Sequence, residues 1–386
     1  DPVKDTGTVC GDTSDALGNF SFTRVRPGEY CVVAVHLSSR KRAIIRGLRV
    51  AENTVAASAS TLRAPGTMRV ELPEAINSVT GSVYVPGTSC FVFLNGQADS
   101  VNLDSLPSGA LPAVAYASTN SPVVRVLRYE VPVTPGGITV IRNPGWVYSR
   151  TLYLNTSPSG AGIAGSVTNV PVLIRLNASN FPFSQAQPGG ADLRFTKADG
   201  HFLPYEIERW DSAGGRAEVW VRLDTVYGNT RKQPLLMYWG NAAVAGTSRG
   251  SAVFDTGSGF GGVWHCGRPA GGVIVDATAN GMQGTPMATA TTEGVIGEAQ
   301  AFNGATSLIR VAATDAQRLN FPENGNYSVS AWVKADRVDS LYRGIVYRSN
   351  FQYGLQIRPE STWEFFTFVA GTGWEGSRTP VQLNAW

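Results

Sequence analysis

The sequence predicts an all-β chain built as a row of β-sandwich domains, on the basis of its composition and of a hydrophobic period of two. The chain has 43 glycines and 22 prolines, and only 16% of its residues are charged. Such a composition is typical of short strands joined by turns, and Val, Thr, Tyr and Trp favour strands. In residues 217–226 apolar side chains alternate with others: Val219, Val221 and Leu223 with Glu218, Trp220 and Arg222. This alternation predicts a strand with one set buried and the other facing solvent or a partner.

The length of 386 residues is enough for two to four domains at about 100 to 200 residues each. We predict four domains, with boundaries at 1–63, 64–145, 146–245 and 246–386. The last is expected to be a jelly roll that is incomplete at its C-terminal end, which would leave an unpaired strand edge.

An internal repeat defines the first two domains. Residues 18–35 (GNFSFTRVRPGEYCVVAV) align without a gap on residues 99–116 (DSVNLDSLPSGALPAVAY), and each copy reads as strand, Pro/Gly turn, strand. The repeat predicts two small tandem sandwiches. Its motif resembles the carboxypeptidase regulatory-like, transthyretin-like domain, which implies a non-catalytic spacer in an exported protein.

The third domain contains the most regular patterning. Strands around residues 203–210, 217–226 and 234–240 are separated by turn formers. The motifs NVPVLIRLNASNFPF, GADLRFTKADGHFLPYEIERWD, AEVWVRLDT and MYWGN occur in that order between residues 169 and 241. Together they resemble the bacterial domain DUF2341, a β-rich module of large secreted or surface proteins. The resemblance implies no catalytic residues.

The fourth domain follows a Gly-rich stretch, residues 242–262, that we expect to be an extended connection. Beyond it come a Trp strand, a DATANG turn, an AFNGATSLI strand and an NYSVSAWVKAD strand. This order resembles the laminin-G-like, concanavalin-type jelly roll.

No motif predicts catalysis. The letters GTSRG around Ser248 lack the strand and helix of a nucleophile elbow. His36, His201 and His265 fall in different predicted domains, with no motif nearby to orient them. Glu206 and Glu208 share one strand face, the one geometry here that could place two carboxylates for glycoside chemistry, but a solvated strand face is the favoured interpretation.

Aromatic residues of the last domain are the candidate ligand-binding residues. Flat rings on a sheet face can stack on sugars, and we select Tyr353, Trp363 and Trp374, the last in a predicted Gly-rich loop. About two thirds of the surrounding aromatic cluster is expected to be core. In residues 362–368 the alternation places Phe366 and Phe368 on one face of the strand and Trp363 and Phe365 on the other.

The sequence leaves the roles of two further groups of side chains undecided. Cys10 and Cys31 are either a disulfide or two small buried residues, and the sequence does not decide whether Cys90 and Cys266 are free. Asp276 could contribute one ligand to a calcium ion, but no metal-binding cluster surrounds it in the sequence; no other cofactor is expected.

Composition excludes several functions. The net charge of +3 comes from scattered basic residues, which argues against nucleic-acid binding. The sequence has no apolar run of about twenty residues, so no membrane span is predicted. The start at Asp1 shows no leader, so we expect any signal peptide to be removed or to lie outside this stretch.

These observations predict a non-catalytic, exported bacterial protein, secreted or held at the cell surface, that acts in adhesion by binding a polysaccharide or cell-surface glycan. One alternative is a self-associating subunit of an extracellular filament or sheath. A second is the accessory region of a secreted carbohydrate-active enzyme. The argument from resemblance concerns fold, and function depends on sites.

Overall fold

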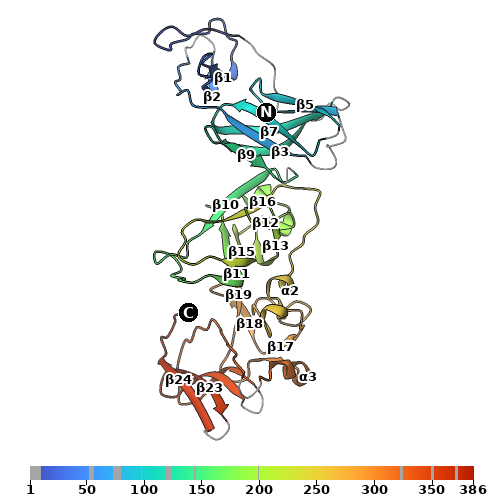
Figure 1. The fold of residues 1–386 in the computed structure, drawn as a ribbon. Coiled ribbons are helices and arrows are strands. Elements are labelled where there is room, and N and C mark those ends of the chain that lie inside the picture. Colours follow the sequence, from blue (N-terminus) through green and yellow to red (C-terminus); the bar gives the residue numbers. More distant parts are fainter. Residues whose placement is uncertain are drawn as a thin grey trace.

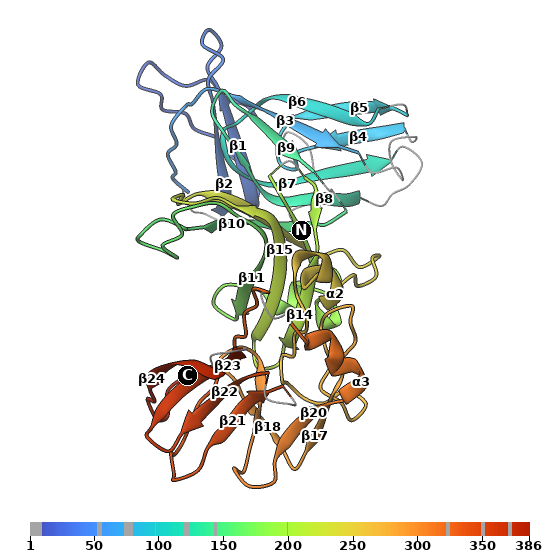
Figure 2. The same cartoon turned by 60° about the horizontal axis from the view of Figure 1, so that its bottom comes forward.

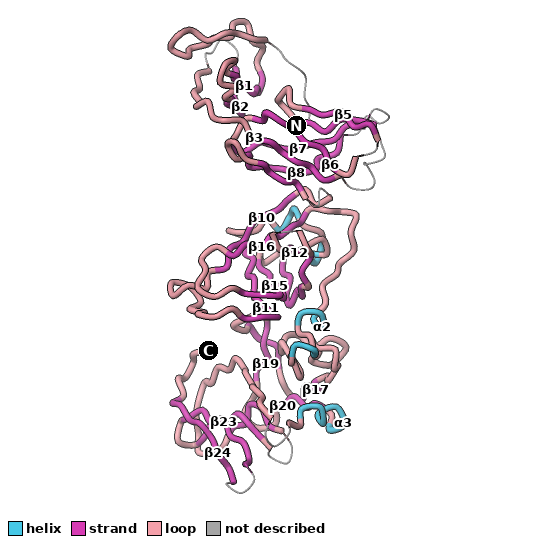
Figure 3. The backbone as a smooth tube through the Cα atoms, in the orientation of Figure 1, coloured by secondary structure: helices cyan, strands magenta, loops and turns pink. Residues whose placement is uncertain are grey.

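The computed structural model describes residues 10–51, 56–72, 80–96, 98–118, 124–142, 145–198, 200–321, 325–348, 352–369 and 373–386. Its regular structure is nearly all strand (Figure 3), as predicted. The described helices are single turns: α2 (Gly250–Val253), α3 (Ala313–Ala316), η1 (Phe183–Gln185), η2 (Pro188–Gly190), η3 (Thr256–Ser258) and η4 (Gln317–Leu319). Within the described residues, no helix has the length and apolarity needed to cross a membrane.

Three β-rich bodies follow one another along the molecule (Figure 1), with the N-terminal strands at one end and β21 to β24 at the other. The first body is a hairpin beside a two-sheet sandwich. Its sheets have the orders β1-β2, β6-β3-β9 and β5-β4-β7-β8. The strands are β1 (Gly28–Val35), β2 (Arg42–Val50), β3 (Gly66–Glu71), β4 (Thr80–Tyr84), β5 (Phe91–Asn95), β6 (Ser100–Leu106), β7 (Gly109–Ser118), β8 (Val124–Val133) and β9 (Ile138–Ile141).

The two copies of the repeat differ in how much sheet they form. In the second copy β6, β7 and β8 contribute to a sandwich with a continuous apolar core that includes Leu103, Leu111 and Leu127. In the first copy the equivalents of β7 and β8 pair as β1 and β2, whereas residues 18–23 form no strand. The hairpin leans on the second copy through Ile44.

The central body is a sandwich of two sheets, ordered β10-β16-β12-β13 and β11-β15-β14. The alternation in β15 is confirmed, because Val219, Val221 and Leu223 lie in the core between the sheets. The strands are β10 (Tyr148–Leu154), β11 (Val167–Asn177), β12 (Arg194–Thr196), β13 (Phe202–Leu203), β14 (Tyr205–Asp211), β15 (Arg216–Val226) and β16 (Gln233–Trp239).

One buried carboxylate ties together two of the sequence motifs of this body. Asp192, from the GADLRF motif, accepts hydrogen bonds from the backbone N–H groups of Gly240 (2.6 Å) and Asn241 (3.0 Å) in the MYWGN motif. It also accepts one from the backbone of Gln187 at 2.8 Å. Gly240 has φ +84°, and a Cβ there would lie 2.5 Å from the ring of Tyr148, so the turn requires glycine.

The last body consists of small antiparallel sheets, β17-β20 and β18-β19, and the larger sheet β21-β22-β23-β24 (Figure 2). The strands are β17 (Gly284–Met287), β18 (Ala290–Glu293), β19 (Glu298–Ala301), β20 (Leu308–Val311), β21 (Arg343–Tyr347), β22 (Tyr353–Arg358), β23 (Thr362–Val369) and β24 (Gly373–Pro380).

The strand predicted at residues 326–336 is not part of a sheet in the described structure. Burial still alternates there, with Val329 and Val333 partly covered and Trp332 64% exposed. The sequence pattern accounts for the alternating burial, but a sheet also needs a hydrogen-bonding neighbour, and no strand is paired with this segment among the described residues.

The extended connection predicted at residues 242–262 is wrong from Gly250 onward, where the chain packs, whereas residues 242–249 are mostly exposed and form no helix or strand. Val253 and Phe254 are buried, and they form an apolar cluster with Ala277 against Trp220, Phe260 and Val263. The backbone N–H of Arg249 donates to the carbonyl of Tyr205 at 2.9 Å, which fixes α2 beside β14. Two apolar side chains in a Gly-rich stretch were enough to pack its second part against the central sheet, because the outer face of that sheet offers Trp220.

Candidate functional site at the junction of the central and C-terminal bodies

A β-bulge in β14 concentrates charged side chains on the outer face of the three-stranded sheet. Ile207 pairs with Val219 and Arg209 pairs with Glu218, so Glu208 is an extra residue between them. The bulge directs both Glu208 and Arg209 outward, whereas strict alternation would turn Arg209 into the core. The prediction that Glu206 and Glu208 share a face is therefore confirmed.

His265 lies between these two carboxylates. Its Nε2 is 3.0 Å from Glu206 Oε2, and its Nδ1 is 3.2 Å from Glu208 Oε2. The indole N–H of Trp220 donates to the same oxygen of Glu208 at 2.7 Å, and the Trp220 ring stacks on the imidazole at 6.2 Å between centroids. We call Glu206, His265 and Glu208 the junction triad.

The turn between β18 and β19 covers the triad from the C-terminal side. A Cβ at Gly297 would lie 2.5 Å from Glu208 Oε1, and the φ of +56° at this position favours glycine. The side chain of Glu208 is 6% exposed and that of His265 is 19% exposed. The triad is thus enclosed between β14, β15, α2 and the β18–β19 hairpin.

Burial and charge act on the triad in opposite directions. For His265, burial lowers the pKa, but the hydrogen bond and charge of Glu206 and the charge of Glu208 outweigh it and raise the pKa above 6.5. For Glu208, burial raises the pKa above 4.5 despite the cation at His265. Burial and the charge of Glu208 also raise the pKa of the Cys266 thiol. A protonated imidazole donates to both carboxylates at once, so the charged form of His265 suits this geometry.

A second group of ion pairs lies beside the triad and spans the same junction. Arg209 binds Glu218 through two hydrogen bonds of 2.7 and 2.8 Å, and it reaches Glu293 of β18 at 3.1 Å. Arg216 also contacts Glu293 at 3.1 Å, and Arg175 donates to the carbonyl of Val295 at 2.6 Å. The outer face of the central sheet is therefore bound to the C-terminal body.

The geometry of the triad opposes glycoside chemistry. Both imidazole nitrogens are engaged by carboxylates, so neither can take a proton from a substrate. The ring also lies between the carboxyl groups, where a glycosidic bond would have to lie. Among the residues that the structure describes, no group of three or more His, Cys, Asp or Glu is arranged to hold a metal ion.

The predicted ligand-binding aromatics fall in three different environments. The prediction that Tyr353 binds a ligand is wrong. Its side chain is 5% exposed and packs on Phe321 and Tyr327, and its hydroxyl donates to the carbonyl of Leu319, so Tyr353 belongs to the core. Trp363 is half-buried and pairs with Ile357.

Trp374 lies in strand β24 opposite Phe368, and the predicted loop is wrong. Antiparallel pairing with β23 extended the strand into the Gly-rich segment, which glycine content alone had suggested to be a turn.

Asp276 stabilises its own turn. Its two carboxylate oxygens accept hydrogen bonds from the backbone N–H groups of Val263, Thr278 and Met282 at 2.9 to 3.0 Å and from the Thr278 hydroxyl at 2.9 Å. These bonds give the carboxylate of Asp276 a structural role within its turn.

Cys10 and Cys31 both lie in the described part of the chain, and no disulfide joins them. Cys10 is exposed on a segment without regular structure, whereas Cys31 is in β1 with its sulfur close to Gly87. Of the two alternatives that the sequence left open, the structure therefore does not support the disulfide. Cys90 is buried and Cys266 is half-buried beside the triad.

The sequence did not reveal that His265 is oriented by two carboxylates, because its partners lie about sixty residues earlier in the chain. Two signals were present. Trp220 points outward from β15, and a large aromatic on an outer face indicates that something covers that face. Val253 and Phe254 supplied apolar side chains to cover it.

Comparison with known proteins identifies one stretch of the chain. No curated protein and no solved structure matches the chain significantly. A protein-family model described as a domain of unknown function, DUF2341, matches residues 189–265. The match ends at His265, so the region that resembles DUF2341 includes every member of the junction triad.

Proposed function

We propose that this chain is a non-catalytic, exported bacterial protein whose modules present a polysaccharide-binding C-terminal body at the cell surface or in the medium. The observation that carries the proposal is the junction triad. The carboxylates and the imidazole of the triad bind one another and are enclosed at the contact between two bodies. This arrangement suits a rigid connector better than an active site.

The proposed roles of the modules follow the resemblances in the sequence. The first body acts as a transthyretin-like spacer, and the last acts as a laminin-G-like binding module. The ion pairs of Arg209, Arg216 and Glu293 support a stiff connection between DUF2341 and the binding module. A stiff connection holds a binding surface at a fixed distance and orientation from the spacer.

Retention of the purified chain on immobilised polysaccharides, with and without EDTA, tests this function. We expect retention by one class of glycan, and no hydrolysis of that glycan by the wild-type chain. Hydrolysis that disappears in Glu206→Gln or Glu208→Gln would show an enzyme and contradict the proposal.

A second candidate function, a subunit of an extracellular filament, is favoured by one observation. Residues 325–335 show the alternating burial typical of a strand, and they are paired with no strand in the described structure. A segment with this pattern can take up a strand from another copy. Sedimentation that shows large assemblies growing with protein concentration would support this candidate, and a monomer at every concentration would exclude it.

A further inference from the structure

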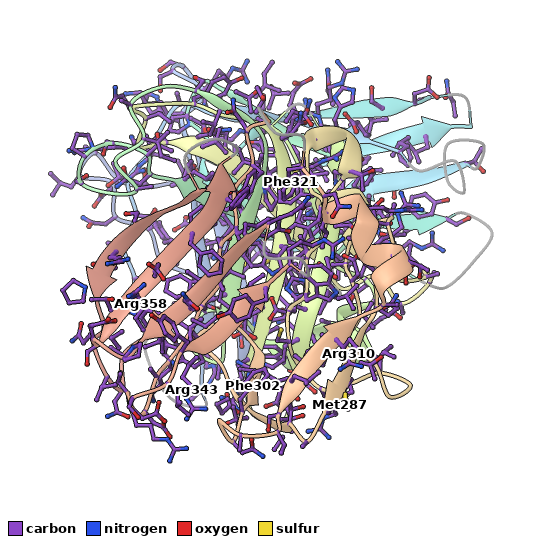
Figure 4. All side chains as sticks on the ribbon, turned by 90° about the horizontal axis from the view of Figure 1, so that it is seen from below. Met287, Phe302, Arg310, Phe321, Arg343 and Arg358 are labelled. Atoms are coloured by element: carbon purple, nitrogen blue, oxygen red, sulfur yellow. The ribbon has the colours of Figure 1, made fainter. Side chains whose placement is uncertain are left out.

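The outer face of the β21–β24 sheet combines exposed aromatic rings with a fixed polar group. The sheet forms one end of the molecule, and Figure 4 looks onto that end with Arg343 and Arg358 labelled on its strands. Cross-strand pairing assigns its two faces. Tyr353, Leu355, Ile357 and Phe365 share the inner face with the core ring of Tyr327, while Gly354, Gln356, Glu364 and Phe366 share the outer face.

Glycines let aromatic rings on this outer face lie flat. The pairing places Tyr347, Gly354, Phe366 and Gly376 in one row across the four strands. A Cβ at Gly344 would overlap the Tyr347 ring, and a Cβ at Gly354 would lie 2.5 Å from the Phe366 ring. Both rings therefore occupy space that any other residue would fill, and they lie along the sheet.

Two exposed rings, those of Tyr347 and Phe368, lie on either side of the Phe366 ring, which is 8% exposed. Tyr347 is 47% exposed and its centroid is 5.9 Å from that of Phe366. Phe368 follows two residues later on the same face of β23 and is 55% exposed. We call Tyr347, Phe366 and Phe368 the aromatic platform.

A polar row borders the aromatic platform. Glu364 is 4% exposed and accepts hydrogen bonds from Gln356 at 2.6 Å, Arg378 at 2.8 Å and Arg358 at 3.0 Å. The Tyr347 hydroxyl donates to Gln356, which fixes the ring in place. Gln356 is hydrogen-bonded to Tyr347 on one side and to Glu364 on the other, so the polar groups beside the rings are preorganised.

The charges of this row are balanced, which selects among ligands. Arg358 also binds Glu360 at 3.0 Å, so the two arginines face two carboxylates. An acidic glycan would need uncompensated cations here. A neutral pyranose with equatorial hydroxyls instead offers flat C–H faces to the electron-rich ring faces and hydroxyls to the side chain of Arg378, which is 56% exposed.

We propose that the aromatic platform, with Gln356 and Arg378 at its edge, is a binding site for a neutral polysaccharide whose pyranose units present flat C–H faces. The inference rests on the proposed function and deepens it, since it names the site and the class of glycan. It moves the binding residues from the predicted Tyr353 to the opposite face of the same sheet.

Isothermal titration of the full chain with β-1,4-linked glucohexaose tests the site. Tyr347→Ala and Phe368→Ala are each expected to weaken binding by about tenfold, the loss of one stacking contact. Tyr347→Phe keeps the ring and should lose less. Trp332→Ala is the matched control, because Trp332 is exposed in the same body but lies outside the platform, and it should bind as wild type does. Circular dichroism establishes that each variant is folded.

The outcomes separate the site from the function. If the wild-type chain binds the hexaose and both alanine variants bind equally well, the site is wrong and the proposed function stands. Binding of oligogalacturonate in preference to the neutral hexaose would overturn the assignment of a neutral glycan. If the wild-type chain binds neither these probes nor any immobilised polysaccharide, the proposed function fails together with the site.

Discussion

The substitution His265→Gln tests whether the imidazolium holds the central and C-terminal bodies together. Glutamine has a similar reach, but its amide group donates toward one carboxylate only and turns a carbonyl oxygen toward the other. Glu206 and Glu208 would then face each other without a cation. Their side chains are only 15% and 6% exposed, so water compensates little.

Removing one partner of a buried ion pair destabilises a protein by about 3 kcal/mol or more. For a cooperative unit of this size, that loss corresponds to a melting temperature lower by roughly 6–12 °C. Differential scanning calorimetry measures it, and tryptophan fluorescence offers a second probe because Trp220 stacks on His265. His201→Gln, an exposed histidine of the central body, is the control and should melt with the wild type.

The stability of the folded protein should depend on pH in a definite direction. The folded pKa of His265 is raised above 6.5, so its contribution to stability is complete below about pH 6.5 and is lost as the pH rises through the folded value. Glu208, also raised, acts in the same direction from about pH 4.5 upward. In wild type the stabilisation by protonated His265 is lost as the pH rises through its folded pKa, so the difference in melting temperature between wild type and variant should be largest near pH 5 and should narrow as the pH rises. Equal melting temperatures of wild type and variant from pH 5 to 8 would refute the reasoning.

Three further substitutions test other parts of the structure by thermal or urea unfolding. Arg209→Met should lower the free energy of unfolding by about 3 kcal/mol, because it leaves Glu218 buried and unpaired. Arg209→Lys should lower it by less but still measurably, since lysine cannot form the bidentate pair. Equal stability of the wild type and both variants would contradict this. Asp192→Asn should cost about 1–3 kcal/mol, because an amide N–H would face the donors of Gly240 or Gln187, and a neutral result would show that the carboxylate is dispensable. Tyr353→Ala should cost about 3–5 kcal/mol as a core truncation, whereas an unchanged stability with lost glycan retention would restore its predicted role in binding.

The fold class and the faces of the best-patterned strands follow from local sequence pattern alone. The alternation in β15 assigned Val219 and Val221 to the core and Glu218 to the outer face, because a period of two admits no other arrangement in a half-buried strand. The same rule placed Glu206 and Glu208 together, and Phe366 on the face opposite Phe365. Local chemistry was sufficient in each case.

Which distant groups meet depends instead on how the strands pair and pack. The bulge at Glu208 depends on how β14 pairs with β15, and the pairing of His265 with both carboxylates depends on the docking of a segment that the sequence predicted to be an extended linker. Likewise, Trp374 became part of a strand only because β23 lies beside it. Contacts of this kind arise from burial and hydrogen bonding between elements, which no local pattern encodes.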